Sequence, residues 1–181
     1  LGATAMIAAR LDDIAWTLNL RGTDVHCTPV FVAWLVIGQD NAMLFIDDEK
    51  LTPEVSAYLQ HEGVAVKPYG SIADYLRTCN EYAMLIDPDT VNSRLAQVRG
   101  HYNTVTAPSP IAAMKAVKNP TEREGFRNAM TRDGVAMTRF LKWLEEAVPQ
   151  GGETELTVAE RLRMERAAQP LFRDLSFDTI A

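Results

Sequence analysis

Residues 30–46 read VFVAWLVIGQDNAMLFI, in which two apolar runs flank one short polar turn. The first run, Val30 to Ile37, is continuous and rich in branched and aromatic residues, which is typical of a strand buried on both faces. The second run covers Ala42 to Ile46, and only residues 39–41 (QDN) separate the two. Because so short a connection cannot carry a parallel crossover, we expect the two strands to be antiparallel neighbours.

On both sides of this stretch, expected strands alternate with expected helices. Short apolar runs predict strands, whereas apolar residues at helical spacing predict helices, the third of which follows a possible capping box of Ser71 and Asp74. The expected strands cover residues 4–9, 64–69, 83–86 and 102–106, and the expected helices cover residues 11–20, 53–61, 71–79 and 92–98. This alternation is typical of an α/β fold whose mixed sheet is flanked by helices.

A proline-containing segment, residues 107–110 (APSP), marks the end of this α/β unit. Proline restricts the backbone of the residue before it, so secondary structure commonly stops there. We therefore expect a first domain at residues 1–110, a helical connector at residues 111–118 and the first part of a second domain at residues 119–181.

The second region opens with Asn119, Pro120 and Glu122, in the order of a capping box with proline at the first helical position. These residues predict a long amphipathic helix to about Ala147, followed by a second helix at residues 157–168 and a strand within residues 175–180. The apolar face of the long helix includes Phe126, Met130, Leu141 and Leu144. If no sheet covers this face, we expect the chain to associate with itself.

Composition argues against several classes of partner. The 181-residue chain has a formal charge of -6 with scattered Lys and Arg, which gives no electrostatic reason to bind nucleic acid or an anionic membrane. No apolar run approaches the roughly 20 residues that a membrane span requires. Cys27 and Cys79 are the 2 cysteines, and so low a content suits the reducing cytoplasm. Because the sequence begins at Leu1 without methionine, we expect that residues before it have been removed.

No spacing in the sequence predicts a metal site. His26, His61 and His101, the 3 histidines, lie on different segments, and the patterns HExxH, CxxC and His-x-His are absent. His26 and Cys27 are adjacent, and adjacent side chains are expected to point in different directions, which argues against a nucleophile pair. We therefore nominate no catalytic residue and no metal ligand, and we leave the substrate-binding residues unassigned.

Three acidic groups and one arginine are the remaining candidates for a functional role. The acidic groups are Asp12 with Asp13, residues 47–49 (DDE), and Asp87 with Asp89, all of which are expected to cap helices or turns. Arg21 follows an apolar helix and precedes Gly22, a position from which its guanidinium could reach a carboxylate, although surface exposure is the ordinary expectation.

Two blocks of the sequence carry a resemblance to a known family. Residues 11–22 read LDDIAWTLNLRG, with PVF at residues 29–31 and MLFID at residues 43–47. They resemble the middle domain of the three-domain aminopeptidases P (Xaa-Pro aminopeptidases), whose members carry LDEIAW-LNLRG. A second block, KAVKNPTE at residues 115–122 with LSFDTI at residues 175–180, resembles the entry to the pita-bread catalytic domain of the same creatinase family.

The resemblance implies a fragment made of a creatinase N-terminal-like middle domain and the first helices and strand of an incomplete α+β pita-bread domain. Such enzymes are cytoplasmic homodimeric metallopeptidases that release the N-terminal residue from peptides with proline in second position. They use two divalent metal ions, usually manganese, which supply hydroxide and polarise the scissile carbonyl. The family's metal ligands all follow the LSFDTI strand, so the fragment is expected to hold no metal and to be inactive alone.

A non-catalytic binding or assembly module is the alternative interpretation. Histone chaperones reuse creatinase-like domains for binding rather than hydrolysis, and the same fold can serve both purposes. The close match to LDEIAW-LNLRG favours the enzyme, and the ligands beyond the second block would decide between the two.

Overall fold

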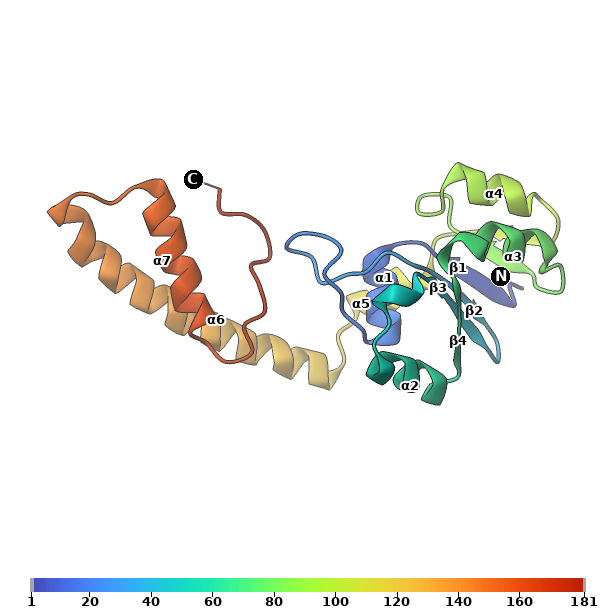
Figure 1. The fold of residues 1–181 in the computed structure, drawn as a ribbon, viewed down its shortest axis with the longest axis horizontal. Coiled ribbons are helices and arrows are strands. Elements are labelled where there is room, and N and C mark those ends of the chain that lie inside the picture. Colours follow the sequence, from blue (N-terminus) through green and yellow to red (C-terminus); the bar gives the residue numbers. More distant parts are fainter. Residues whose placement is uncertain (1, 181) are drawn as a thin grey trace. The chain divides into compact units, whose positions relative to one another are not determined.

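The computed structural model describes residues 2–180, which form two compact units. The first unit contains residues 2–25 and Pro29–Ala116, and the second contains His26–Thr28 and residues 117–180 (Figure 1). Among the described residues, none of the helices has the length and apolarity of a membrane-spanning segment.

The first unit is built on one six-stranded mixed sheet with the strand order β4-β3-β2-β1-β5-β6. The strands are β1 (Ala5–Ala8), β2 (Trp34–Gly38), β3 (Ala42–Ile46), β4 (Val64–Pro68), β5 (Met84–Ile86) and β6 (Thr104–Thr106). Strand β2 runs antiparallel to β1 and β3, whereas the β3/β4, β1/β5 and β5/β6 pairs are parallel. The predicted mixed sheet and the predicted antiparallel β2/β3 pair are confirmed.

Helices cover both faces of this sheet (Figure 1). They are α1 (Leu11–Leu18), α2 (Pro53–His61), α3 (Ile72–Thr78), α4 (Ser93–Arg99) and α5 (Pro110–Ala116), with the 3-10 turns η1 (Asp48–Lys50) and η2 (Tyr69–Ser71). Two of them begin at side-chain N-caps, because the side chains of Thr52 and Asn92 accept hydrogen bonds from the third backbone N–H of α2 and α4.

The alternation of side chains along the strands divides the apolar residues into two cores. On β1, Ala5 and Ile7 face one core and Ala8 faces the other. One core lies against α1, α2 and α5, and includes Ile14 and Leu59, whereas the other lies against α3 and α4. Side chains of one strand thus enter both cores in alternation, which is what the continuous apolar runs in the sequence indicate.

Two local expectations for the first unit are wrong. Strand β2 begins at Trp34 rather than at Val30, because the backbone before it bonds to the preceding loop: Asp24 N donates to Val30 O (3.2 Å) and Val32 N donates to Asp24 Oδ2 (2.7 Å). Ser71 does not cap α3, since its hydroxyl donates instead to the carbonyl oxygen of Pro68 at 2.7 Å.

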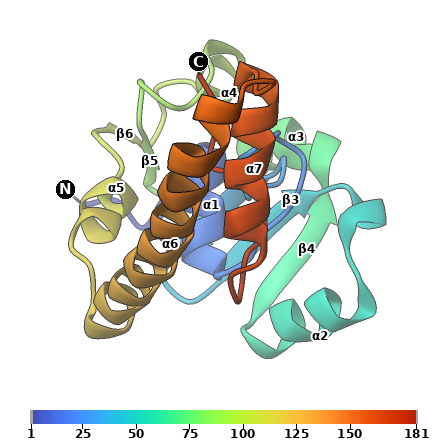
Figure 2. The ribbon, with the colours of Figure 1, turned by 90° about the vertical axis from the view of Figure 1, so that its left-hand side faces the viewer.

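The second unit contains α6 (Pro120–Ala147), the turn η3 (Val148–Gln150) and α7 (Glu155–Ala167). The predicted capping box of α6 is present, with Asn119 Oδ1 and the backbone N–H of Glu122 separated by 2.8 Å. Figure 2 shows α6 and α7 side by side, and Arg166 Nε on α7 donates to Asp133 Oδ1 on α6 at 2.7 Å. This pair of helices is the local structure that the capping and proline signals predicted.

The strand predicted within residues 175–180 is wrong, because these residues have no regular secondary structure. A strand needs a neighbouring strand to accept and donate its backbone hydrogen bonds, and the described part of the second unit contains none. The apolar face of α6 is also largely uncovered, since Phe126, Met130 and Leu141 are 57%, 69% and 51% exposed.

Candidate functional site

One group of three potential metal ligands occurs among residues 2–180, formed by His26, Cys27 and Asp178 of the second unit. His26 Nε2 lies 2.9 Å from Asp178 Oδ1 and 3.4 Å from Cys27 Sγ. The three donor atoms all lie within 4.8 Å of one another. Imidazole, thiol and carboxylate are thus presented to the same small volume.

The backbone at Cys27 explains how two adjacent side chains meet. Cys27 has φ of 56°, in the left-handed region that non-glycine residues seldom adopt. This turn brings its sulfur atom towards the ring of the preceding His26. The expectation that the two side chains point in different directions is therefore wrong, although it holds for extended or right-handed backbone.

The protonation states of this cluster are opposite to those of an activated nucleophile. The hydrogen bond and charge of Asp178 raise the pKa of His26, so the imidazolium form is favoured. Desolvation, together with the negative charges of Asp178 and Asp174, raises the pKa of the Cys27 thiol. A catalytic cysteine needs a lowered pKa, so the direction of these shifts argues against a nucleophile pair.

A second polar cluster lies in the first unit, where Lys115 of α5 contacts both carboxylates of the first turn of α1. Its Nζ lies 2.6 Å from Asp13 Oδ1 and also donates to Asp12 Oδ2. Asp13 is 2% exposed, whereas half of the Asp12 carboxylate faces solvent. Both residues lie in the first turn of α1, where acidic side chains favour the helix dipole, as predicted. They do not cap the helix, because the N-cap is Arg10 and their partner is a lysine more than 100 residues away.

The pKa shifts in this cluster favour the charged forms of both Asp12 and Lys115. Burial raises the pKa of Asp12, but the hydrogen bond and charge of Lys115 outweigh it and leave the pKa lowered. Burial likewise disfavours the ammonium form of Lys115, and the hydrogen bonds to Asp12 and Asp13 reverse this, so its pKa is raised. Lys115 is therefore a structural cation rather than a base available to a substrate.

The other acidic groups behave as predicted. Asp47 accepts a hydrogen bond from the backbone N–H of Glu49 at the start of η1. Asp87 accepts from the backbone N–H groups of Asp89 (3.0 Å) and Ser109 (2.8 Å). Both carboxylates therefore accept hydrogen bonds from backbone N–H groups.

Arg21 lies at a small cavity of about 210 Å³ between the loop after α1 and the sheet. Apolar residues, including Phe31 and Leu44, form part of its lining, and Lys50 at its edge donates to Asp24 at 2.5 Å. Arg21 is exposed, and within residues 2–180 no hydrogen bond or ion pair of its guanidinium is found. The carboxylate partner considered for Arg21 is thus not found in the described part of the chain.

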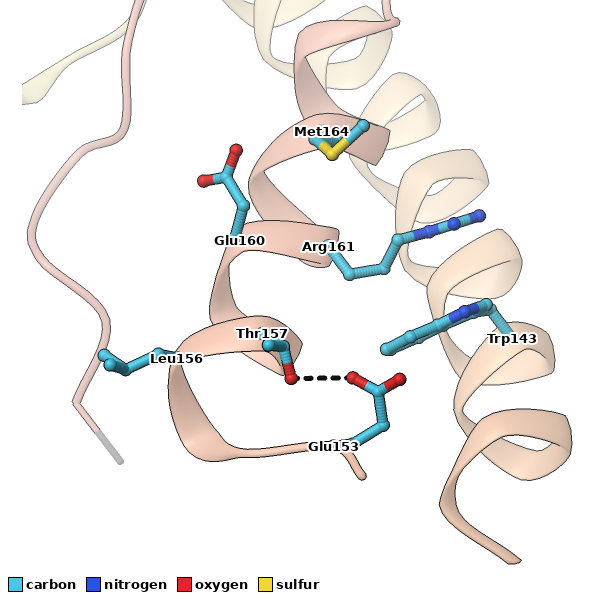
Figure 3. A pocket seen from close by; sticks show the side chains of 7 residues that line it. All are labelled: Trp143, Glu153, Leu156, Thr157, Glu160, Arg161 and Met164. Atoms are coloured by element: carbon cyan, nitrogen blue, oxygen red, sulfur yellow. Dashed lines mark hydrogen bonds between the residues drawn. The ribbon is translucent and has the colours of Figure 1, made fainter. Parts of the chain in front are cut away.

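A shallower hollow of about 430 Å³ lies on the second unit between α6 and α7 (Figure 3). Thr157 Oγ1 donates to Glu153 Oε2 at 2.6 Å, and the guanidinium of Arg161 stacks 5.1 Å from the ring centroid of Trp143. The Arg161–Trp143 contact joins α7 to α6, whereas the Thr157–Glu153 bond lies at the start of α7. The polar groups thus satisfy one another rather than converge on an empty centre.

The remaining histidines join no cluster of metal ligands among the described residues. His61, at the end of α2, is 85% exposed and pairs with its neighbour Glu62 at 3.1 Å. His101 lies in the exposed turn before β6. His26 and Cys27 are adjacent in the sequence, but no sequence signal places Asp178 beside them, because it lies 152 residues after His26.

Comparison with known proteins identifies the first two thirds of the chain. The family model described as the creatinase/prolidase N-terminal domain matches residues 1–122. Xaa-Pro aminopeptidase 1 of Dictyostelium discoideum is 38% identical over 184 residues, which cover 99% of this chain and 29% of that protein. Aminopeptidase P2 of Arabidopsis thaliana is 35% identical over 212 residues, which cover 99% of this chain and 30% of that protein. The chain therefore spans less than a third of the length of these relatives.

Solved structures show the same fold. The X-prolyl aminopeptidase of Caenorhabditis elegans, described as a cytosolic enzyme with a di-nuclear active site, matches with a TM-score of 0.92 at 31% identity. The match covers 98% of this chain and 30% of that one. The Xaa-Pro dipeptidase of Bacillus anthracis matches with a TM-score of 0.65 at 14% identity, which shows similarity of fold alone.

Proposed function

Because the chain belongs to the creatinase/prolidase N-terminal domain family, we propose that it is part of an Xaa-Pro aminopeptidase. In this proposal residues 1–110 form the creatinase-like middle domain, residues 111–118 form a connector, and residues 119–181 begin the catalytic domain. The parent enzyme would release the N-terminal residue from peptides with proline in second position.

The observation that supports this proposal most strongly is the extent of the match to peptidases. The identity of 38% to the Dictyostelium discoideum enzyme runs through 99% of this chain, and so extends well past residue 122, where the match to the family model ends. The fold match to the Caenorhabditis elegans enzyme also covers 98% of the chain. A likeness confined to the α/β unit would support a shared fold and little more.

The residues of this chain do not fit a two-metal site. Two divalent ions close together are held by several bridging carboxylates, whereas the cluster found among residues 2–180 offers one carboxylate with a thiol and an imidazole. We therefore place the two ions of the parent, proposed to be manganese, on residues outside this chain. In agreement with this, we propose that the 181-residue chain alone has no peptidase activity.

The other properties of the parent are proposals of the same kind. A cytoplasmic location is supported by the relative described as cytosolic and by the low cysteine content of the chain, in which Cys27 and Cys79 are both free. We propose a homodimer that acts on proline-containing peptides and binds neither nucleic acid nor membrane, which the net charge of -6 of the 181-residue chain supports.

The test is a peptidase assay on the 181-residue chain and on the full parent protein, both supplied with manganese. We expect the parent to release the first residue of a peptide whose second residue is proline and to leave intact the matched peptide with alanine at that position. We expect the 181-residue chain alone to cleave neither peptide. A parent that binds such peptides but cleaves neither would contradict the enzyme and favour the binding-module alternative.

A further inference from the structure

We propose that His26, Cys27 and Asp178 form a binding site for one Zn²⁺ ion. Zinc is the common biological metal that takes nitrogen, sulfur and oxygen donors together, because it is a borderline-soft cation without a geometric preference of its own. Harder cations such as Mg²⁺ and Ca²⁺ select oxygen ligands only. The presence of a thiol in the set therefore decides the chemical class of the ion.

The donor atoms are already close to the spacing that zinc requires. In a tetrahedral zinc complex with bonds of about 2.0–2.3 Å, neighbouring donor atoms lie about 3.3–3.6 Å apart. The distances from His26 Nε2 are 2.9 Å to Asp178 Oδ1 and 3.4 Å to Cys27 Sγ, and no pair of donor atoms exceeds 4.8 Å. We expect rotations of the side chains to bring the three atoms onto one tetrahedral face.

Two of the ligands are held together before any ion arrives. The left-handed backbone of Cys27 brings its sulfur and the ring of His26 to one side of the turn. A site whose ligands are fixed by backbone geometry loses less conformational entropy on binding than one assembled from free side chains.

The local charges favour a cation at this position. Asp178 supplies a carboxylate within 4.8 Å of the thiol and imidazole donor atoms. A divalent ion stabilises the thiolate while neutralising this carboxylate. Binding forms the zinc–sulfur and zinc–nitrogen bonds and releases the thiol proton, together with the second proton of any His26 imidazolium, to solvent, with no change of oxidation state.

The site would keep one position open. Structural zinc sites use four protein ligands, whereas three protein ligands leave a place for water. The side chains of His26 and Asp178 are 74% and 79% exposed, so solvent reaches the cluster. The fourth ligand is therefore expected to be a water molecule.

The experiment is a titration of the reduced 181-residue chain with Zn²⁺ by calorimetry and with Co²⁺ by absorption spectroscopy. We expect one ion per chain, a thiolate-to-cobalt charge-transfer band, and intense visible bands typical of tetrahedral cobalt that Zn²⁺ removes. Replacing any one ligand, in His26→Gln, Cys27→Ser or Asp178→Asn, should weaken zinc binding by at least the roughly 10- to 100-fold known for altered partners of metal ligands.

Matched controls are available within the same chain. His61→Gln removes another exposed histidine beside a carboxylate, and Cys79→Ala removes the other free cysteine. Both should bind zinc as the unchanged chain does, and circular dichroism should show the same helix content for all variants.

Three results would each overturn the proposal. They are the absence of Zn²⁺ binding, a cobalt spectrum without the thiolate band, or undiminished affinity in the Asp178→Asn variant. Because no readout depends on peptide cleavage, failure here leaves the proposed peptidase function intact, and failure of the peptidase assay does not touch the zinc site.

Discussion

Lys115 Nζ donates a 2.6 Å hydrogen bond to Oδ1 of Asp13, a residue that is only 2% exposed. The contact joins the first turn of α1 to α5, the last helix of the first unit. The two motif blocks that resemble the aminopeptidases P, one around residues 11–22 and one beginning at residue 115, thus meet where Lys115 pairs with Asp12 and Asp13.

Replacement of Lys115 by methionine should destabilise the first unit. The aliphatic stem is kept, but the buried carboxylate of Asp13 loses its cation, and an unpaired buried polar group costs roughly 1–3 kcal/mol. Urea unfolding followed by fluorescence measures the change in the free energy of unfolding. The control is Lys67→Met, at an exposed position on β4, which should stay within about 0.5 kcal/mol of the unchanged chain. Equal effects of the two substitutions would show that the ion pair contributes nothing.

The same cluster predicts how stability depends on pH. Asp12 has a lowered pKa in the folded chain, so its contribution is present above its unfolded pKa of about 3.9 and is lost as pH falls through the lower folded value. Lys115 has a raised pKa, so its contribution is complete below about pH 10.4 and is lost as pH rises through the higher folded value. Unfolding curves collected from acid to alkaline pH should therefore show a plateau between these limits. In the Asp12→Asn variant the free energy of unfolding should fall less steeply as the pH is lowered. An unchanged fall would show that other carboxylates cause the loss of stability in acid.

Gly22 should not tolerate a side chain. A Cβ atom there would lie 2.7 Å from Phe31 Cβ and 2.9 Å from Val30 O, and the latter is backbone that cannot rotate away. Overpacking of this kind costs about 1–3 kcal/mol, so Gly22→Ala should lower the free energy of unfolding by that amount. Gly70→Ala is the control, because a Cβ at Gly70 meets nothing within 4 Å. Similar midpoints for the two variants in thermal unfolding would contradict the close approach.

The uncovered face of α6 should make the chain associate with itself. Phe126 and Met130 are 57% and 69% exposed and lie one helical turn apart, so they form a continuous apolar patch. Sedimentation velocity should show a mean mass that rises with concentration, and the double variant Phe126→Ser with Met130→Ser should remain a monomer. Arg127→Ser, an exposed change on the same helix, should leave association as it was. Concentration-independent monomer in the unchanged chain would refute the prediction.

Local signals in the sequence located most of the helices. The capping residues Thr52, Asn92 and Asn119 each act on the backbone within three residues, so the sequence carries the whole interaction. Ser71 shows the limit of this approach, because a carbonyl three residues before it competes for the same hydroxyl. The strand expected within residues 175–180 shows another limit, since strand formation depends on a partner that the strand's own sequence does not specify.

Long-range pairings could not be predicted. Arg99 is 5% exposed, and its guanidinium donates to the carbonyl oxygens of Cys79 (3.2 Å) and Tyr82 (2.7 Å). In the sequence it is one more basic residue at a helix C-terminus. Asp178 belongs to the candidate zinc site for a similar reason, since its partner His26 lies 152 residues earlier and no spacing rule connects them.

The position of β1 in the sheet has a consequence for the order of folding. This strand lies between β2 and β5, and its neighbour Thr4 meets Ala83 across 79 residues of intervening chain. Strands β1, β2 and β3 are close in the sequence and can pair early. Strands β5 and β6 can join the sheet only after the segment that contains α2 and α3 has been synthesised. During synthesis β1 must therefore present one unpaired edge until β5 emerges, and folding of the whole sheet waits for that late, non-local contact.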